Sequence, residues 1–552
     1  MNNAYAKAVA QQQATPARLY KGLSWNGPME KIAYDDAGDR AALSRLDSPV
    51  FALLHGGRIG LSSEGELGPT GDGPAQLLAA AHPLPYQQLG DPAFRSQYGL
   101  QAAYGAGAMA NGIASVAMVI ELGKAGLLGS FGAAGLVPVR LEEAILAIQA
   151  ALPQGPYAFN LIHSPHEDAL EKRAVDLYLK HQVRTVEASA FLDLTPHIVR
   201  YRAAGLESAP DGSVRIHNRV IVKLSRREVA QHFMKPAPEA ILNALVTAGA
   251  ISEVQAGLAR RVPVADDVTV EADSGGHTDN RPLVGLLPSI IALRDEIQAL
   301  YHYDQPVRVG AAGGISTPAS ALGALMMGAA YLFTGSVNQA AIEAGSSPYT
   351  KTILAKAGMA DVMMAPSADM FEMGVKVQVL KTGTLFPMRA QKLYDTYMRY
   401  NTIDEIPSDE RQKLESQIFK RSLDSVWEDT VKFFSERDPA QIERANQHPK
   451  RKMALIFRWY LGLSSRWSNT GEPGREMDYQ IWCGPSMGSF NDWVQGTYLQ
   501  APENRRVVDI ALQLLTGCSY LYRLQALKLQ GVVLPTSLDQ YRPEKPLIEP
   551  HP

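Results

Sequence analysis

The sequence contains very little cysteine: Cys483 and Cys518 are the only two in 552 residues. Two thiols exclude a disulfide framework and a cysteine-rich metal site, and so few are typical of proteins in a reducing compartment. Residues 1–22 also lack the apolar core of a signal peptide. We therefore expect a cytoplasmic protein.

Neither sign of charge dominates. Lys and Arg number 53 against 56 Asp and Glu, which leaves a net charge of −3 and does not indicate nucleic acid or an anionic membrane as a partner. One uncharged stretch, residues 318–342, has the length of a membrane span, but its Gly, Ser, Asn and Gln residues divide it into helix, strand and helix. We expect this stretch inside a soluble α/β fold.

Motifs for metal-dependent catalysis are missing as well. The chain has 12 histidines but no His-x-x-x-His pair, and no cluster of carboxylates accompanies a suitable histidine. We therefore predict no catalytic metal site.

From about residue 105 to 345, short β-like runs alternate with amphipathic helical patterns. This alternation predicts a parallel α/β fold, and eight strands in ~240 residues match the usual size of a (β/α)8 TIM barrel. The predicted strands are Tyr104–Met109, Gly126–Phe131, Tyr157–Ile162, Thr185–Ala188, Val220–Leu224, Val268–Ala272, Val307–Gly310 and Ala330–Phe333.

Two of these strands run directly into glycines. One reads Glu271-Ala-Asp-Ser-Gly-Gly-His-Thr-Asp-Asn280, and the other reads Val307-Arg-Val-Gly-Ala-Ala-Gly-Gly-Ile-Ser316. Glycines let backbone N–H groups approach a ligand, and the helix that follows the second turn adds positive partial charge. These turns predict a nucleotide-like cofactor that carries a phosphate.

A third glycine turn, Thr334-Gly-Ser-Val337, follows the next predicted strand. Two consecutive strand ends that present backbone amides are the arrangement by which a (β/α)8 barrel grips a phosphate after its last two strands. The barrel is therefore favoured over a Rossmann fold.

The regions that flank the barrel differ from it in composition. Residues 1–100 are rich in turns and are expected to form an extension packed on the barrel of residues 101–345. Residues 346–552 carry helix start signals and five of the six tryptophans. They predict a mainly helical domain that faces the substrate or its carrier.

Asn160 and Lys223 are polar residues in otherwise apolar predicted strands, where burial without a partner is costly. A polar cofactor ring would satisfy both side chains. The alternative for Lys223 is an internal ion pair with Glu187 or Glu271.

His277 follows two glycines at a strand end, so its ring can project over the mouth of the barrel. A histidine in that position can donate a proton near neutral pH or orient a carbonyl group. The alternative is a loop histidine that is bonded to Asp273 or Asp279.

Several of these segments carry a resemblance to a known superfamily. In chain order they are Gly-Ala-Met-Ala at 107–110, Phe-Asn-Leu at 159–161, Glu-Ala-Asp-Ser-Gly-Gly-His at 271–277, Ala-Ala-Gly-Gly-Ile at 311–315 and Thr-Gly-Ser at 334–336. Together they resemble the FMN-binding barrel of the 2-nitropropane dioxygenase/nitronate monooxygenase superfamily, which includes flavin-dependent enoyl-ACP reductases.

Further segments narrow the resemblance. The chain length, the N-terminal extension, the run Gly275-Gly-His-Thr-Asp-Asn-Arg-Pro282 and the block of residues 365–387 resemble the PfaD branch. Its members are free-standing enoyl reductases of polyunsaturated fatty acid synthases and trans-acyltransferase polyketide synthases. A nitronate monooxygenase-like flavin oxidase is the alternative function that the superfamily offers.

The resemblance implies FMN as cofactor and NADPH as reductant, with hydride passing from NADPH through the flavin to the β-carbon of an enoyl thioester. It implies His277 and Lys223 as catalytic residues. The implied cofactor contacts are Ala108, Met109, Ala110, Asn160, Lys223, Glu271, Gly275, Gly276, Gly313, Gly314, Gly335 and Ser336. One departure is the last turn, Thr-Gly-Ser-Val-Asn-Gln, where many relatives have Gly-Thr-Arg-Phe.

The resemblance also implies acyl carrier protein domains of a polyketide or fatty acid synthase as partners. Docking on such acidic domains is usually steered by exposed Lys and Arg. The candidates are Lys381, Arg389, Lys392 and the run of Lys450, Arg451 and Lys452. The sequence leaves the oligomeric state open, with a homodimer as one option.

Overall fold

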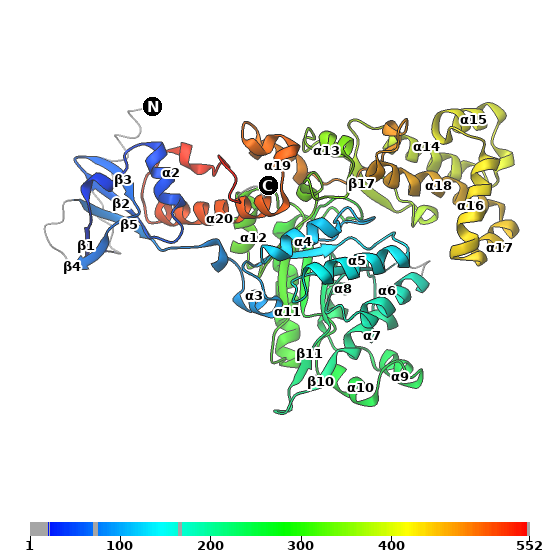
Figure 1. Cartoon of the computed structure of the whole chain (residues 1–552), viewed down its shortest axis with the longest axis horizontal. Coiled ribbons are helices and arrows are strands. Elements are labelled where there is room, and N and C mark those ends of the chain that lie inside the picture. The colour runs from blue at the N-terminus through cyan, green and yellow to red at the C-terminus, as the bar shows by residue number, and fades with distance from the viewer. Residues whose placement is uncertain (1–19, 21–22, 70–74, 164–167, 549–552) are drawn as a thin grey trace.

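The computed structural model describes residues 20, 23–69, 75–163 and 168–548. Figure 1 shows a barrel, with a small N-terminal sheet at one end of the molecule and a group of helices at the other. The expectation about a signal peptide concerns residues that lie almost entirely outside these ranges. Among the described residues, no helix combines the length and hydropathy that a bilayer crossing requires.

Eight parallel strands close into a barrel in the order β12-β13-β14-β15-β6-β7-β8-β9. Every predicted strand is present, with ends that shift by a few residues, so the predicted (β/α)8 fold is confirmed. The strands are β6 (Tyr104–Ala106), β7 (Leu128–Phe131), β8 (Ala158–Ile162), β9 (Thr185–Ser189), β12 (Arg219–Leu224), β13 (Asp267–Glu271), β14 (Arg308–Ala312) and β15 (Leu332–Thr334).

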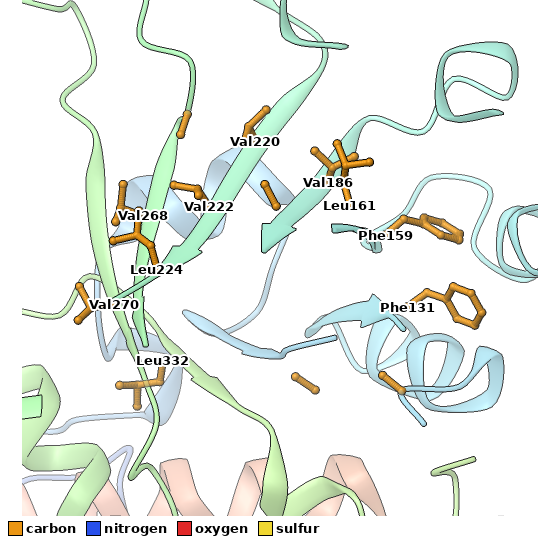
Figure 2. Close-up of a cluster of buried hydrophobic side chains, with 14 of the residues drawn as sticks. Phe131, Phe159, Leu161, Val186, Val220, Val222, Leu224, Val268, Val270 and Leu332 are labelled. Carbon is orange, nitrogen blue, oxygen red and sulfur yellow. The ribbon is translucent and has the colours of Figure 1, made fainter. Parts of the chain in front are cut away.

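Helices surround this barrel and cover the outward side chains of its strands. They include α4 (Val116–Lys124), α5 (Pro138–Ala151), α6 (Asp168–Lys180), α7 (Pro196–Ala204), α8 (Arg227–Met234), α11 (Leu283–Tyr301) and α12 (Pro318–Met326). Figure 2 shows part of the apolar layer between strands and helices, with Phe131, Phe159, Val186, Val222 and Val268 among its labelled members. Because side chains alternate along a strand, the residues between these apolar positions face the barrel interior.

The place of an eighth helix is taken by α20 (Val507–Leu529), from the far end of the chain. It packs against α12 on one side and contacts α4 on the other. Figure 1 shows α20 running across the molecule next to α12 and on to the N-terminal sheet. The barrel is therefore completed by a segment that the sequence predicts to belong to the helical domain.

The N-terminal region also packs on α20. Its sheet has the order β3-β2-β5, formed by β2 (Val50–His55), β3 (Arg58–Ser62) and β5 (Gln76–Ala81), and α2 (Asp36–Ser44) lies beside it. A separate two-stranded sheet pairs β1 (Leu23–Asn26) with β4 (Glu66–Pro69). The buried Arg523 of α20 donates hydrogen bonds to the carbonyls of Leu43 and Ser48, both at 2.7 Å.

A separate apolar core lies between residues 340 and 487. The same part of the chain contains a hairpin of β16 (Val362–Pro366) and β17 (Lys376–Leu380), with helices before and after it. These helices are α13 (Pro348–Leu354), α14 (Phe386–Arg399), α15 (Ser408–Lys413), α16 (Leu423–Arg437), α17 (Pro439–Gln447) and α18 (Pro449–Thr470), with α19 (Ser486–Val494) after them. We propose that the helical domain ends near residue 487 and that the remaining residues belong with the barrel and the extension.

The narrow, N-terminal end of the barrel is closed by α3 (Pro92–Tyr98). Inside the barrel, Arg308 and Asp267 form a bidentate ion pair at 2.7 and 2.9 Å, and the Tyr98 hydroxyl donates to Asp267 at 2.5 Å. All three side chains are buried, and the Phe94 ring stacks on Tyr331 at a centroid distance of 4.0 Å. This end therefore holds a buried structural ion pair.

We predict that Asp267→Asn destabilises the protein strongly, because it leaves the buried Arg308 guanidinium without a counter-charge. Loss of one partner of a buried ion pair costs about 3–5 kcal/mol. The matched control is Glu239→Gln, which breaks the equally bidentate but exposed pair with Arg260 (2.8 and 2.9 Å). The midpoint of urea unfolding, followed by far-UV circular dichroism, should fall for Asp267→Asn alone; equal midpoints for the two variants would contradict this account.

Candidate functional site at the C-terminal end of the barrel

The wide end of the barrel carries a layer of polar side chains that point inward. Asn160, Glu187, Lys223 and Glu271 come from the successive strands β8, β9, β12 and β13. Their strand neighbours, such as Val186, pack outward against the helices. Polar side chains near the C-terminal ends of barrel strands are positioned to bind a ligand.

Lys223 and Glu271 are paired across this layer. The Lys223 ammonium donates to Glu271 Oε1 at 2.8 Å, and Ser274 Oγ donates to the same oxygen at 3.2 Å. Burial lowers the pKa of Lys223, but the charges of Glu271 and Glu187 outweigh it and raise the pKa above its ordinary value. Lys223 is therefore a fixed positive charge at neutral pH, as the ion-pair alternative predicts.

Asn160 and Glu187 are joined through the backbone of β9. The Asn160 amide donates to the carbonyl of Glu187 at 3.0 Å and to Ser189 Oγ at 2.8 Å. The Ala108 amide, just beyond β6, donates to Glu187 Oε2 at 2.8 Å. The segment Ala108–Ala110 thus lies half-buried at the mouth, beside the polar layer.

The predicted glycine turns lie at the ends of β14 and β15. Gly313 and Gly314 both have left-handed backbone conformations, with φ of 75° and 73°. A Cβ on Gly313 would lie 2.6 Å from the carbonyl oxygen of Ala272, so this glycine is required for packing. A Cβ on Gly314 or on Gly335 would meet no atom within 4 Å, so both turns open onto free space at neighbouring strand ends.

These turns fit the phosphate of FMN, the cofactor that the resemblance implies. Among the described residues, the amides of Gly314 and Gly335 have no hydrogen-bond acceptor. The amides of Ser316 and Thr317 are satisfied by Ser320 Oγ at 2.9 and 3.0 Å, so the helix cap itself is closed. Within the described part of the chain, the Oγ of Ser130 on β7 and the Oδ1 of Asn338 after β15 are buried without a hydrogen-bond partner. The arrangement suits a polar ring with a phosphate.

The loop after β13 is held by the hairpin of the helical domain. Gly276 and Gln378 pair in both directions, with N–O distances of 2.9 and 2.7 Å. A Cβ on Gly275 would lie 2.8 Å from the amide nitrogen of Cys483. The next residue, Gly484, donates its amide to Ser336 Oγ at 3.2 Å. The segment around Cys483 therefore bridges the loop after β13 and the turn after β15.

His277 lies in this loop and is bonded to a residue of the hairpin region. Its Nε2 lies 3.0 Å from Asp369 Oδ2. Asp273 and Asp279, the carboxylates expected from the sequence as alternatives, bind Gln378 and Arg226 instead. Burial lowers the pKa of His277, but the hydrogen bond and the charge of Asp369 outweigh it and raise the pKa above 6.5.

Two features of the site are not predicted from the sequence. Asp369 lies 92 residues from His277, and nothing in the block of residues 365–387 that contains it links this carboxylate to the histidine. From the sequence, Glu187 is predicted only as an alternative partner of Lys223. The signal that could have identified it is the single carboxylate within the strand Thr185-Val-Glu-Ala-Ser189, which indicates a polar side chain that points into the barrel.

The stretch Gly484-Pro-Ser-Met-Gly488 matches the Gly-x-Ser-x-Gly pattern of serine hydrolases. Both glycines are explained by packing, because a Cβ on Gly488 would lie 2.1 Å from the amide nitrogen of Met359 and one on Gly484 would strike Gly275. Ser486 starts α19 and has no histidine partner in the described part of the chain. This stretch is not a nucleophile turn. Nor do the described residues contain a group of three or more His, Cys, Asp or Glu side chains that could hold a metal ion.

Most of the cations expected to steer a carrier protein have partners inside the domain. Lys450 donates to the carbonyl of Tyr400 at 2.5 Å, Arg451 donates to Gln441 at 2.7 Å, and Lys452 lies over the ring of Trp427. Arg389 pairs with the buried Asp478, and Lys392 pairs with Glu410. Lys381 is exposed and lacks such a side-chain partner in the described ranges.

Two family models match this chain. The model for the fatty acid synthase subunit PfaD N-terminal domain matches residues 25–83, the region of the N-terminal sheet. The model for the inserted helical domain of acyl-carrier-protein S-malonyltransferase matches residues 400–479, the region of α15 to α18.

Related proteins match most of the chain. One polyunsaturated fatty acid synthase subunit of Thraustochytrium sp. is 49% identical over 510 residues, which are 91% of this chain and 34% of the relative. Another polyunsaturated fatty acid synthase subunit of the same organism is 52% identical over 475 residues, 85% of this chain and 23% of the relative. Polyketide biosynthesis protein PksE of Bacillus subtilis is 46% identical over 436 residues, 79% of this chain and 56% of the relative. The chain thus spans about a third, a quarter and half of these relatives.

One solved structure is similar along its whole length. The enoyl reductase domain of MlnA, from the macrolactin biosynthesis cluster of Bacillus amyloliquefaciens, is 40% identical with a TM-score of 0.77. The match covers 81% of this chain and 100% of that domain.

We predict that Asp369→Asn lowers the pKa of His277, because burial remains while the stabilising charge is lost. Histidine-selective NMR titration measures this pKa, with His277→Ala to assign the signal and Asp193→Asn, which removes the partner of the surface His232, as control. An unchanged pKa in Asp369→Asn would contradict the pairing.

The pair of His277 and Asp369 makes the stability of the fold depend on pH, in the direction set by the pKa shifts of the two residues. The folded pKa of His277 is raised, so its contribution is complete below pH 6.5 and is lost as pH rises through the raised value. Burial raises the pKa of Asp369, but His277 outweighs it and the net shift is downward, so that contribution is present above pH 3.8. The pair stabilises the fold most between these two values.

Proposed function

Because the chain belongs to the PfaD family of enoyl reductases, we propose that it reduces enoyl thioesters bound to acyl carrier protein. In this proposal FMN is the cofactor and NADPH the reductant, and the enzyme acts in trans within polyunsaturated fatty acid or polyketide biosynthesis. The observation that carries the proposal is the inward polar layer of the barrel, which lies at the same end as the two open glycine turns. When bound, FMN supplies the redox step, in which hydride from NADPH reaches the β-carbon of the substrate.

The phosphate has a defined place in this proposal. The amides of Gly314 and Gly335 open toward it, and the start of α12 adds positive partial charge. Lys223 holds a positive charge in the polar layer and would be one of the residues that hold the bound cofactor. Glu271 keeps the Lys223 side chain in one position.

In this proposal His277 is the proton donor. Hydride addition at the β-carbon builds negative charge on the thioester oxygen and the α-carbon, and a nearby acid must neutralise it. Asp369 raises the pKa of His277, so the imidazolium persists toward neutral pH and can donate its proton to the α-carbon. Asp369 acts here as a positioning residue.

The carrier contacts are proposed for the helical domain. The similarity of residues 400–479 to an inserted domain of an enzyme that acts on acyl carrier protein supports this placement. Lys381 follows β17 of the hairpin that pairs with the His277 loop, and among the expected cations in the described ranges it is the exposed one without a side-chain partner.

The experiment that tests the function separates its two half-reactions. We predict that His277→Ala still binds FMN and is reduced by NADPH, but that reoxidation by an enoyl thioester on acyl carrier protein slows by ~10²–10⁴. The control is His217→Ala, a surface histidine paired with Glu207 on a peripheral hairpin. Stopped-flow absorbance of the flavin measures both steps. A wild-type enzyme that NADPH reduces but enoyl thioester does not reoxidise would contradict the proposed function.

A second prediction tests the phosphate turn. Gly314→Val should weaken FMN binding by ~10–100-fold, because the branched side chain occupies the space through which the amide reaches the phosphate. The control is Gly249→Val, which has a similar left-handed φ (65°), equally open surroundings and no proposed ligand. Fluorescence titration of the apoproteins measures the affinities. Equal weakening in both variants would show backbone strain in place of a lost phosphate contact.

A further inference from the structure

Glu187 presents an unsatisfied carboxylate oxygen at the centre of the site. Its side chain has no exposed surface, and Oε2 accepts a hydrogen bond from the Ala108 amide at 2.8 Å. The other oxygen, Oε1, is equally buried and has no hydrogen-bond partner among the residues that the structure describes. A buried carboxylate oxygen without a donor is costly, so it is retained where something else supplies the donor.

The neighbouring side chains do not supply this donor. The Asn160 amide is committed to the Glu187 carbonyl and to Ser189, and the Lys223 ammonium is bonded to Glu271. A Cβ on Gly107 would lie 3.4 Å from Oε1, so a side chain at this position would contact the carboxylate. Among the described residues, Oε1 therefore has no donor.

The charges of the layer favour a ligand that donates a hydrogen bond at this point. Glu187 and Glu271 carry two negative charges against the single positive charge of Lys223. An anionic group of a ligand, such as a phosphate or a thioester enolate, would be repelled by Oε1. An N–H group of a polar ring is attracted to it, and a charge-assisted hydrogen bond of this kind is among the stronger ones in proteins.

We propose that Glu187 Oε1 accepts a hydrogen bond from the imide N–H of the bound flavin, which is the only N–H of the oxidised ring system. This assignment rests on the proposed function, which makes FMN the cofactor. The Ala108 amide fixes the carboxylate, and Glu187 selects a ring with an N–H at that position. Its negative charge also disfavours the electron-rich reduced ring, so it holds the reduction potential of the bound flavin down.

The test compares FMN with N3-methyl-FMN, in which a methyl group replaces the imide hydrogen. Apoprotein should bind FMN ~10–100-fold more tightly than the methylated flavin. Glu187→Ala removes the acceptor and makes room for the methyl group, so it should bind both flavins with equal affinity. Glu187→Gln keeps an acceptor but loses the charge, so it should retain only part of the preference and shift the potential of bound FMN to more positive values.

The matched control is Glu171→Gln, which alters a buried carboxylate whose two oxygens are bonded to His163 and Thr195 outside the barrel interior. This variant should keep the full preference for FMN and the wild-type potential. If Glu187→Ala does not fold, as judged by its thermal midpoint, Glu187→Gln decides through both readouts.

Two results would overturn the assignment of Glu187. They differ in whether they also contradict the proposed function. Equal affinity of the wild-type apoprotein for both flavins, or a full preference retained in the Glu187 variants, would reject the role of Glu187 and leave the proposed function intact. Failure of the wild-type apoprotein to bind FMN at all would reject the proposed function, and this assignment with it.

Discussion

The structure depends on how the barrel accommodates charged side chains that are buried in its interior. Each such group needs a partner, and the two ends of the barrel meet this requirement differently. At the narrow end, Arg308 and Tyr98 both donate hydrogen bonds to Asp267. At the wide end, Lys223 is paired with Glu271, but one carboxylate oxygen of Glu187 has no hydrogen-bond partner among the described residues. The end with incomplete pairing is the end at which the glycine turns are open.

The outer regions serve this wide end in different ways. The helix α20 fills the eighth helical place around the barrel and ties the N-terminal sheet to it. The hairpin of β16 and β17 pairs with the loop after β13, and Asp369, between its strands, raises the pKa of His277 against the opposing effect of burial. A barrel alone would leave His277 without this carboxylate. The helical domain thus contributes to the site directly as well as through any contact with a carrier.

Much of the fold follows from local sequence patterns. Apolar runs such as Val220–Leu224 and Val268–Ala272 mark the strands because inward and outward positions are both buried, and glycines mark their functional ends. The candidate residues Asn160, Lys223, Glu271, Gly314 and Gly335 all lie at one end of the barrel for the same reason. Pairing between distant segments could not be predicted, since no local pattern links His277 to Asp369 or places α20 between α12 and α4.

The most direct measurement of the central claim is the reduction of the purified flavoprotein in anaerobic stopped-flow experiments, with NADPH and an alkyl nitronate compared as electron donors. An enoyl reductase site predicts rapid bleaching of the flavin by NADPH, little bleaching by the nitronate, and recovery of the flavin spectrum on mixing with an enoyl thioester on acyl carrier protein. Rapid bleaching by the nitronate alone would contradict the account and indicate an oxidase.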